Sequence, residues 1–206
     1  MSSELPASWR TLEGPATHEI PKIKRSRFIA DVAPVGDVDG ARAHVEAIRK
    51  RHHAARHVCW AWRLGPDGST SRSSDDGEPS GSAGRPILQA IEGADLTDVV
   101  VAVTRYYGGV KLGVGGLVRA YGDAAAEGLA HARVKTIVPT RDVVVELDYD
   151  QLGVIEALCA REGRDRPEAE YGERVRFVFA VPIAEAEGLA ARLIEASAGR
   201  ATVSLV

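Results

Sequence analysis

Two segments of the chain carry residue types that could do chemistry, and the first is a stretch rich in serine, glycine and acid over residues 73–86. Asp75, Asp76 and Glu78 stand close together there, and carboxylate oxygens are the ligands that Mg²⁺ and Ca²⁺ prefer. Their spacing does not match the alternating ligands of an EF-hand loop. Glycine and serine lose much conformational freedom on ordering, so an ordered loop of this kind usually holds a specific backbone shape.

Three interpretations of this stretch stay open: a structural turn, a loop that contacts a partner, or a metal site. Asp-Gly and Glu-Pro pairs are most often plain turns, so we predict no metal ligands. Ser80 or Ser82 could cap a following helix whose first turn contains Pro86. The residues that we assign to this motif loop are Asp75, Asp76, Gly77, Glu78, Pro79, Gly81, Gly84 and Arg85.

The second segment covers residues 104–119, where an apolar strand, a glycine-rich loop and a helix follow one another. Backbone N–H groups and the positive end of a helix dipole can hold an anion at such a junction. Cations there would add charge, and tyrosines could stack on bases. The residues concerned are Arg105, Lys111 and Arg119, Tyr106 and Tyr107, and the glycines Gly108, Gly109, Gly113, Gly115 and Gly116. A structural loop that lets a helix and a strand pack closely is the alternative.

The glycine pattern is neither a nucleotide-hydrolysis motif nor a dinucleotide motif. Val114 and Gly115 stand where a Walker A sequence needs lysine followed by serine or threonine. Val118 stands in the third glycine position of a dinucleotide fingerprint. We therefore disfavour nucleotide hydrolysis and predict no cofactor.

Basic side chains gather in two further runs. One run consists of Lys22, Lys24, Arg25 and Arg27, and the other covers residues 49–57 with arginine, lysine and three histidines. Either run suits contact with phosphate, and either is also compatible with a solvated face. Sequence alone does not place the two runs on one surface.

A nucleophile beside a general base would indicate a hydrolase. Serines are plentiful in residues 69–82 and histidines in residues 52–57, but no G-x-S-x-G elbow occurs. Cys59 lies in a strand pattern, which favours a small core residue over a nucleophile. We predict no catalytic residue, and a hydrolase of peptidase or phosphoesterase type that uses the Ser/Asp loop remains the alternative.

The spacing of apolar residues predicts the strands and helices that must position these segments. Upstream of residue 135 the pattern predicts strands over 17–20, 27–35, 56–64 and 98–104, a helix from Asp37 or Asp39 to about Arg51, and helices over 86–91 and 115–131. Residues 98–104 are apolar at nearly every position, as a central strand requires. A mixed α/β N-terminal domain over residues 16–135 follows, after a flexible lead-in over residues 1–15.

The last third of the chain has a clearer pattern. It predicts a strand over 141–148, a helix over 149–162, strands over 165–171 and 174–181, a helix over 184–197 and a strand over 201–206. This β-α-β-β-α-β order is the ferredoxin-like arrangement, in which four antiparallel strands bury one face under two helices. We place this C-terminal domain at residues 140–206, and the fold class is α+β.

Composition excludes several classes of protein. The 206 residues are 45% apolar, and the net charge is −3, so neither disorder nor a strong overall field is predicted. The longest apolar run, Val99–Val103, is far shorter than the ~20 residues of a membrane helix, and the N-terminus lacks an apolar signal core. Cys59 and Cys159 form no CxxC pair. We expect a cytoplasmic protein with no membrane contact.

Two long segments closely resemble the signature of the IMPACT/YigZ family: SSDDGEPSGSAGRPIL (73–88) and VVVAVTRYYGGVKLGVGGLVRAYGDA (99–124). The shorter stretches KRSRFIA (24–30) and RHVCWAW (56–62) are also similar to that family. The resemblance implies an N-terminal domain with the fold of ribosomal protein S5 domain 2. It also implies a C-terminal ferredoxin-like domain similar to the last domain of translation elongation factor G.

That pair of folds suggests contact with RNA, the ribosome or a translation factor, and no small-molecule substrate is evident. We expect a non-enzymatic regulator of translation. Its expected contact surface consists of Arg105, Tyr106, Tyr107, Lys111 and Arg119, with Lys24, Arg25 and Arg27 assisting. Besides the hydrolase, the remaining alternative is an adaptor that docks the glycine loop on another protein and binds no nucleic acid.

Overall fold

The structure is a computed structural model that describes residues 5–206, and it divides into two compact units, Met1–Ile137 and Val138–Val206. Each unit has its own sheet, helices and core, and each is described by itself. The first four residues of the predicted flexible lead-in lie outside the described residues.

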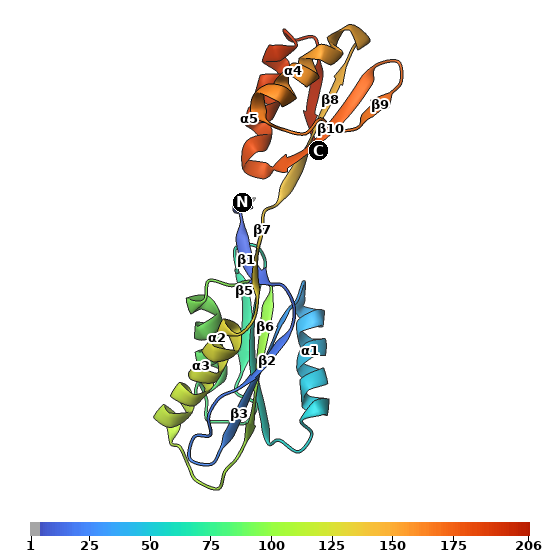
Figure 1. Cartoon of the computed structure of the whole chain (residues 1–206). Coiled ribbons are helices and arrows are strands. Elements are labelled where there is room, and N and C mark those ends of the chain that lie inside the picture. The colour runs from blue at the N-terminus through green and yellow to red at the C-terminus, as the bar shows by residue number, and fades with distance from the viewer. Residues whose placement is uncertain (1–4) are drawn as a thin grey trace. The chain divides into compact units, whose positions relative to one another are not determined.

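A five-stranded antiparallel sheet forms the centre of the first unit (Figure 1). Its strands, in spatial order, are β2 (Ala16–Glu19), β3 (Arg27–Pro34), β6 (Val99–Tyr106), β4 (His57–Leu64) and β5 (Thr70–Ser74). The middle strand is β6, and every residue from Val99 to Arg105 is buried. This strand is the predicted central strand, and it is covered on both faces as its apolar sequence requires.

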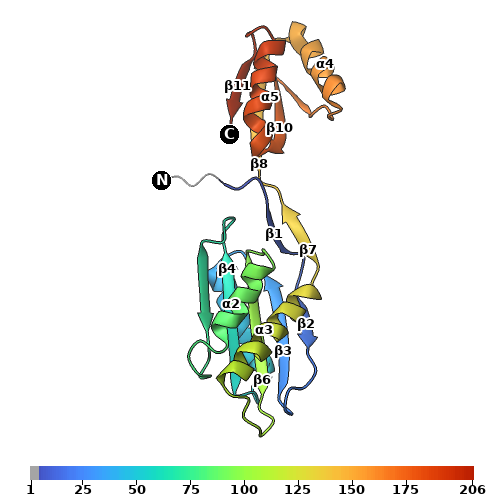
Figure 2. The ribbon, with the colours of Figure 1, turned by 90° about the vertical axis from the view of Figure 1, so that its left-hand side faces the viewer.

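Three helices cover this sheet: α1 (Val38–Arg51) on one face, and α2 (Gly84–Gly93) and α3 (Val114–Ala130) on the other (Figures 1 and 2). The larger core lies under α2 and α3, and the stacked Trp60 and Trp62 lie on the α1 side. The Asp37 carboxylate accepts the Gly40 N–H at 2.7 Å, which makes Asp37 the N-cap of α1. No helix of residues 5–206 is long and apolar enough to cross a membrane.

The strand register brings four loops to one end of this sheet. Arg27, at the start of β3, pairs with Tyr106 at the end of β6, and His57, at the start of β4, pairs with Arg105. Strand β5 runs antiparallel to β4 and therefore ends toward the same side. We call this side the loop end, and it consists of residues 20–26, 52–56, 75–83 and 107–113. The basic, acidic and glycine-rich segments of the sequence meet there.

The second unit has a four-stranded antiparallel sheet in the order β11-β8-β10-β9, with helices α4 and α5 packed on it (Figure 1). Its elements are β8 (Thr140–Leu147), a short helix η1 (Tyr149–Gln151), α4 (Leu152–Glu162), β9 (Ala169–Tyr171), β10 (Val175–Pro182), α5 (Ile183–Ala196) and β11 (Thr202–Leu205). The predicted element order is therefore the observed one. The apolar residues predicted to face inward on β8 and β10 are buried in one cluster with both helices.

Three strands escaped the sequence analysis. Residues 9–12, placed in the flexible lead-in, form β1 (Trp9–Leu12), which pairs with β7 (Val134–Ile137) and buries Leu12 completely. Both strands are too short to show a period. Strand β5 lies in what looked like a polar loop, because its sequence, TSRSS, has no apolar side chain. Backbone pairing with β4 alone makes it a strand.

A comparison of two glycines in α3 tests the packing of this helix on the sheet. A Cβ at Gly128 would lie 2.7 Å from the Ala30 Cβ, whereas a Cβ at Gly122 would make only ordinary contact with Pro86. Gly122→Ala should therefore raise the free energy of unfolding by about 0.5–1 kcal/mol through helix propensity. Gly128→Ala should lower it by about 1–3 kcal/mol through overpacking. Urea unfolding followed by tryptophan fluorescence measures both, and equal effects at the two sites would contradict the packing described.

Candidate functional site

Asp75 organises the acidic loop of the loop end. One of its carboxylate oxygens accepts the N–H groups of Ala83 and Gly84 at 2.9 Å, and the other accepts that of Gly81 at 2.8 Å. Asp75 therefore satisfies free N–H groups at the start of α2, and the predicted caps, Ser80 or Ser82, are wrong. Burial opposes ionisation of this carboxyl, but the three N–H groups outweigh it and hold the pKa of Asp75 below its usual range.

Asp76 is also bound from within the unit. Its carboxylate accepts the Val58 N–H at 2.7 Å and pairs with the Arg49 guanidinium. Its carbonyl oxygen lies 2.8 Å from Nδ1 of His57, and since a carbonyl can only accept, Nδ1 donates. These contacts fasten the acidic loop to β4 and to the end of α1.

Glu78 completes a buried polar network with Arg105 and Tyr121. The Glu78 carboxylate accepts from the Arg105 guanidinium at 2.6 Å and from the Tyr121 hydroxyl at 2.8 Å. The Arg105 and Glu78 side chains are 6% and 5% exposed. Burial raises the pKa of the Tyr121 hydroxyl and of the neighbouring Cys59 thiol well above their ordinary values, so both groups stay protonated. Arg105 is thus a buried member of an ion pair and not the exposed cation that we expected.

The three carboxylates of the acidic loop are therefore each held by protein donors. Among residues 5–206 no group of three or more His, Cys, Asp or Glu side chains is arranged to hold a metal ion. Cys59, which the sequence placed in the core, is buried, and its Sγ lies 3.0 Å from the Asp75 carbonyl oxygen.

The glycine loop differs from the acidic loop in leaving its helix uncapped. The N-cap of α3 is Gly113, with φ +75°, and no side chain of the described residues hydrogen-bonds to this helix end. Tyr107, Val110 and Val114 are exposed on the loop and the first turn of the helix. An uncapped helix N-terminus presents free N–H groups and a partial positive charge.

Gly108 locks the glycine loop onto a basic turn. A Cβ at Gly108 would lie 2.1 Å from the backbone of Arg25, and its N–H donates to the Ser26 hydroxyl at 3.2 Å. The turn itself is Lys24-Arg25, closed by two backbone hydrogen bonds between Ile23 and Ser26. Only glycine permits this close approach, so the exposed Lys24 and Arg25 lie beside the glycine loop.

The remaining predicted residues are divided between internal and exposed positions. Arg27 makes a two-point ion pair with Glu19 at 2.8 Å, and its guanidinium lies over the Tyr106 ring. The Tyr106 hydroxyl contacts His52 at 2.9 Å. Arg119 is exposed on α3. The structure therefore brings Lys24, Arg25, Tyr107 and Lys111 to the loop end as exposed groups, and it gives Arg27, Arg105 and Tyr106 protein partners.

A cleft of about 370 Å³ lies between the acidic loop and the glycine loop. Its lining residues come from both loops, the start of β4 and the residue before it, the end of β6 and the first turn of α3. They are Arg56, His57, Glu78, Pro79, Arg105, Tyr107, Lys111, Leu112, Gly113, Val114 and Leu117. Arg119 is not among them. The sequence contained these residue types but not their juxtaposition, because β4, β5 and β6 bring together positions that are far apart in the chain.

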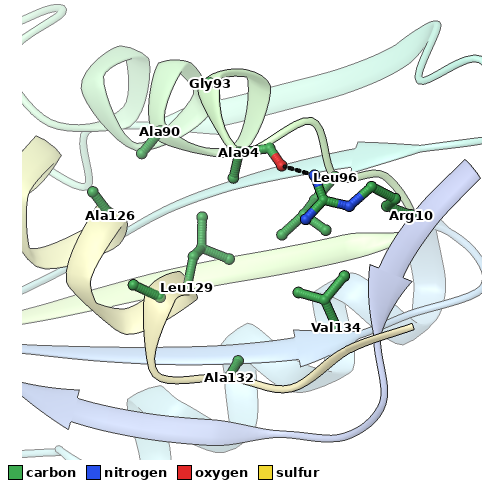
Figure 3. A pocket seen from close by; sticks show the side chains of 10 residues that line it. Arg10, Ala90, Gly93, Ala94, Leu96, Ala126, Leu129, Ala132 and Val134 are labelled. Atoms are coloured by element: carbon green, nitrogen blue, oxygen red, sulfur yellow. Dashed lines mark hydrogen bonds between the residues drawn. The ribbon is translucent and has the colours of Figure 1, made fainter. Parts of the chain in front are cut away.

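A larger hollow of about 540 Å³ lies elsewhere, between the C-terminal parts of α2 and α3 (Figure 3). Its lining is almost entirely apolar, with alanines and Leu129 prominent. The one charged residue, Arg10, donates to the Ala94 carbonyl oxygen at 3.2 Å. This hollow lacks convergent polar groups, so the cleft at the loop end is the candidate site.

The fold and the loop end define a two-unit α+β protein with a cleft of basic and apolar residues. The Impact N-terminal domain model matches residues 24–129, and a model for a domain of unknown function (DUF1949) matches residues 145–200. The chain belongs to the IMPACT family.

Relatives match along the whole chain or part of it. The IMPACT family member YigZ of Escherichia coli is 38% identical over 194 residues, which are 93% of this chain and 95% of that protein. The protein IMPACT homolog of Saccharomyces cerevisiae is 36% identical over 93 residues, 43% of this chain and 35% of that one. A crystal structure described as a hypothetical protein is 37% identical, covers 98% of both chains and superposes with a TM-score of 0.67.

Removing the Asp75 carboxylate should destabilise the first unit. Asp75→Ala leaves three N–H groups without their acceptor, so the free energy of unfolding should fall by about 1–3 kcal/mol at neutral pH. The folded pKa lies below the unfolded value of about 3.9, so this contribution is present above pH ~3.9 and is lost as the pH falls through the folded pKa. Urea unfolding at several pH values checks this, and the exposed Asp123→Ala is the control. A difference that grows on acidification would contradict it.

A double-mutant cycle tests the buried pair. Arg105→Met or Glu78→Gln alone should lower the free energy of unfolding by about 3–5 kcal/mol, because each leaves an unpaired buried charge. The double variant should lose clearly less than the sum of the two. All three tryptophans, Trp9, Trp60 and Trp62, lie in the first unit, so fluorescence follows its unfolding. Additive losses would show that the two side chains do not interact.

Proposed function

We propose that this protein binds RNA, on the ribosome or with a translation factor, through the loop end of its first unit, and that it thereby regulates translation. Membership of the IMPACT family supports the proposal. We also propose the finer fold and domain assignment: a ribosomal protein S5 domain 2-like domain over residues 16–135 and a ferredoxin-like domain over residues 140–206. The β-α-β-β-α-β order and the strand order β11-β8-β10-β9 support the second.

The observation that carries the proposal is the conformation of the Lys24-Arg25 turn. Both residues have positive φ angles, +45° and +68°. Tight hairpin turns with two positive φ values favour Asn-Gly, because side chains with a Cβ cost about 1–2 kcal/mol each there. Two exposed cations in these positions oppose local stability, and strained residues concentrate at functional sites. Contact with an anionic polymer accounts for their presence.

The charges of the loop end support the same conclusion. Beside the loop end, Arg49 and Arg105 pair with Asp76 and Glu78 of the acidic loop, and Arg27 pairs with the exposed Glu19 at the end of β2. Five cations of the loop end, Lys22, Lys24, Arg25, Arg56 and Lys111, are exposed and have no ion-pair partner among residues 5–206. Such cations release counterions when they meet phosphates, which gives affinity that falls steeply with salt.

A turn replacement separates binding from folding. Lys24→Asn/Arg25→Gly should relieve strain and raise the free energy of unfolding by about 1 kcal/mol. The same variant should bind structured RNA about 10–100-fold more weakly at low salt, with a salt slope reduced by about 1–2. Fluorescence anisotropy with labelled RNA measures the affinity, and thermal unfolding measures the stability.

The matched control is Arg133→Asn/Lys135→Asn, which removes two exposed cations at and just before β7, on the far side of this unit from the loop end (Figure 1). It should leave the affinity nearly unchanged.

An affinity of the wild-type protein for RNA that stays the same between low and high salt would overturn the proposal. Pull-down of bound partners with and without ribonuclease distinguishes RNA binding from docking on a protein, since only the former is lost after digestion.

A further inference from the structure

The lining of the cleft at the loop end combines basic side chains with apolar and aromatic ones. Arg56, His57 and Lys111 lie among its lining residues, together with the buried Arg105. The apolar and aromatic lining residues are Pro79, Leu112, Val114 and Leu117, together with the half-exposed ring of Tyr107. Its volume of about 370 Å³ lies within the range of sites that hold small organic ligands, about 300–1,000 Å³.

Arg105, near the end of β6, is a buried lining residue of the cleft whose guanidinium is only partly satisfied by the protein. Its side chain is 6% exposed and is held by Glu78 through Nη1, but its Nε is buried and has no hydrogen-bond partner among the described residues. A buried donor without an acceptor costs about 1–3 kcal/mol, and more for a charged group. Arg105 also lines the cleft, so an anion bound there would lie near a guanidinium that Glu78 alone does not satisfy.

The start of α3 supplies further donors to the same cleft. Gly113 and Val114, which line it, are the N-cap and first residue of a helix that no described side chain caps. Helix α2, by contrast, has the Asp75 carboxylate at its start. Glu78 is the only carboxylate in the cleft lining, and Arg105 already neutralises it. Arg56 and Lys111 thus leave the cleft with an excess of positive charge.

Tyr107 provides a surface for a planar group. Its ring lies 5.4 Å from the guanidinium carbon of Arg105, and the residue is 47% exposed. Aromatic side chains in such positions stack on bases, each worth about 1–3 kcal/mol on alanine substitution. A ligand that suits both kinds of lining residue therefore combines an anion with a flat, weakly polar ring.

We propose that this cleft binds a single nucleotide, with its phosphate among Arg56, Lys111 and the start of α3, and its base against Tyr107 and the apolar lining residues. The inference rests on the proposed function, because in RNA the ligand would be one nucleotide turned out of the strand. A free nucleoside monophosphate has the same chemistry, so the test distinguishes the two sources.

The test compares four probes with the full chain by isothermal titration calorimetry: AMP, UMP, inorganic phosphate and adenosine. AMP and UMP should bind more tightly than either phosphate or adenosine. Lys111→Ala should weaken both nucleotides at least about 10-fold, and Tyr107→Ala should weaken them similarly while leaving phosphate unchanged. Arg133→Ala, exposed just before β7 and absent from the cleft lining, is the matched control and should change nothing. All three side chains are exposed, and circular dichroism checks that the variants fold.

Several outcomes would overturn the inference. Phosphate binding as tightly as AMP, with Tyr107→Ala silent, would show a bare anion site, and nucleotide binding insensitive to Lys111→Ala would place the ligand elsewhere. If the protein binds RNA, but AMP and UMP neither bind to it nor compete with the RNA, the nucleotide cleft is refuted and the proposed function stands. Nucleotide binding without RNA binding would support the cleft for a free nucleotide and refute the proposed function.

Discussion

The buried ion pair between Arg105 and Glu78 is the constraint on which the loop end depends. It joins the central strand β6 to the acidic loop, and the Tyr121 hydroxyl extends it to α3. Replacing a buried pair by apolar groups is often neutral for stability, so the pair is better understood as fixing position than as strengthening the fold. With Glu78 held there, the acidic loop forms one side of the cleft, and the glycine loop, which follows Arg105 directly, forms another.

Around this pair, some helix starts and turns have the residues that favour local stability, and others do not. At the start of α2 the Ala83 and Gly84 N–H groups donate to the Asp75 carboxylate, as does the Gly81 N–H just before the helix, whereas the start of α3 has no side-chain cap among the described residues. Lys24 and Arg25 hold a turn that suits Asn-Gly. Natural sequences depart from local consistency mainly where function requires it. The departures lie on the glycine loop and the basic turn, which Gly108 holds in contact.

Much of the fold was predictable from periodicity because the buried faces are long and regular. The alternation of Phe177 and Phe179 on β10 and the apolar run of β6 correspond to the strands observed. Strand β5 was missed because its side chains show no pattern typical of a strand, and only its backbone pairing with β4 makes it one. The burial of Arg105 was not predictable for a related reason: its partner Glu78 stands 27 positions away, and only the fold brings the two together.

The distribution of charge follows from these contacts. A net charge of −3 gives no overall attraction for a polyanion. In the first unit, however, Asp75, Asp76 and Glu78 are all engaged by internal donors, and their charges are opposed at close range by N–H groups or guanidinium groups. The exposed lysines and arginines of the adjoining loops lack such compensation. A chain of modest negative charge can therefore present a locally positive end, because its acids are used within the fold while these bases remain in solvent.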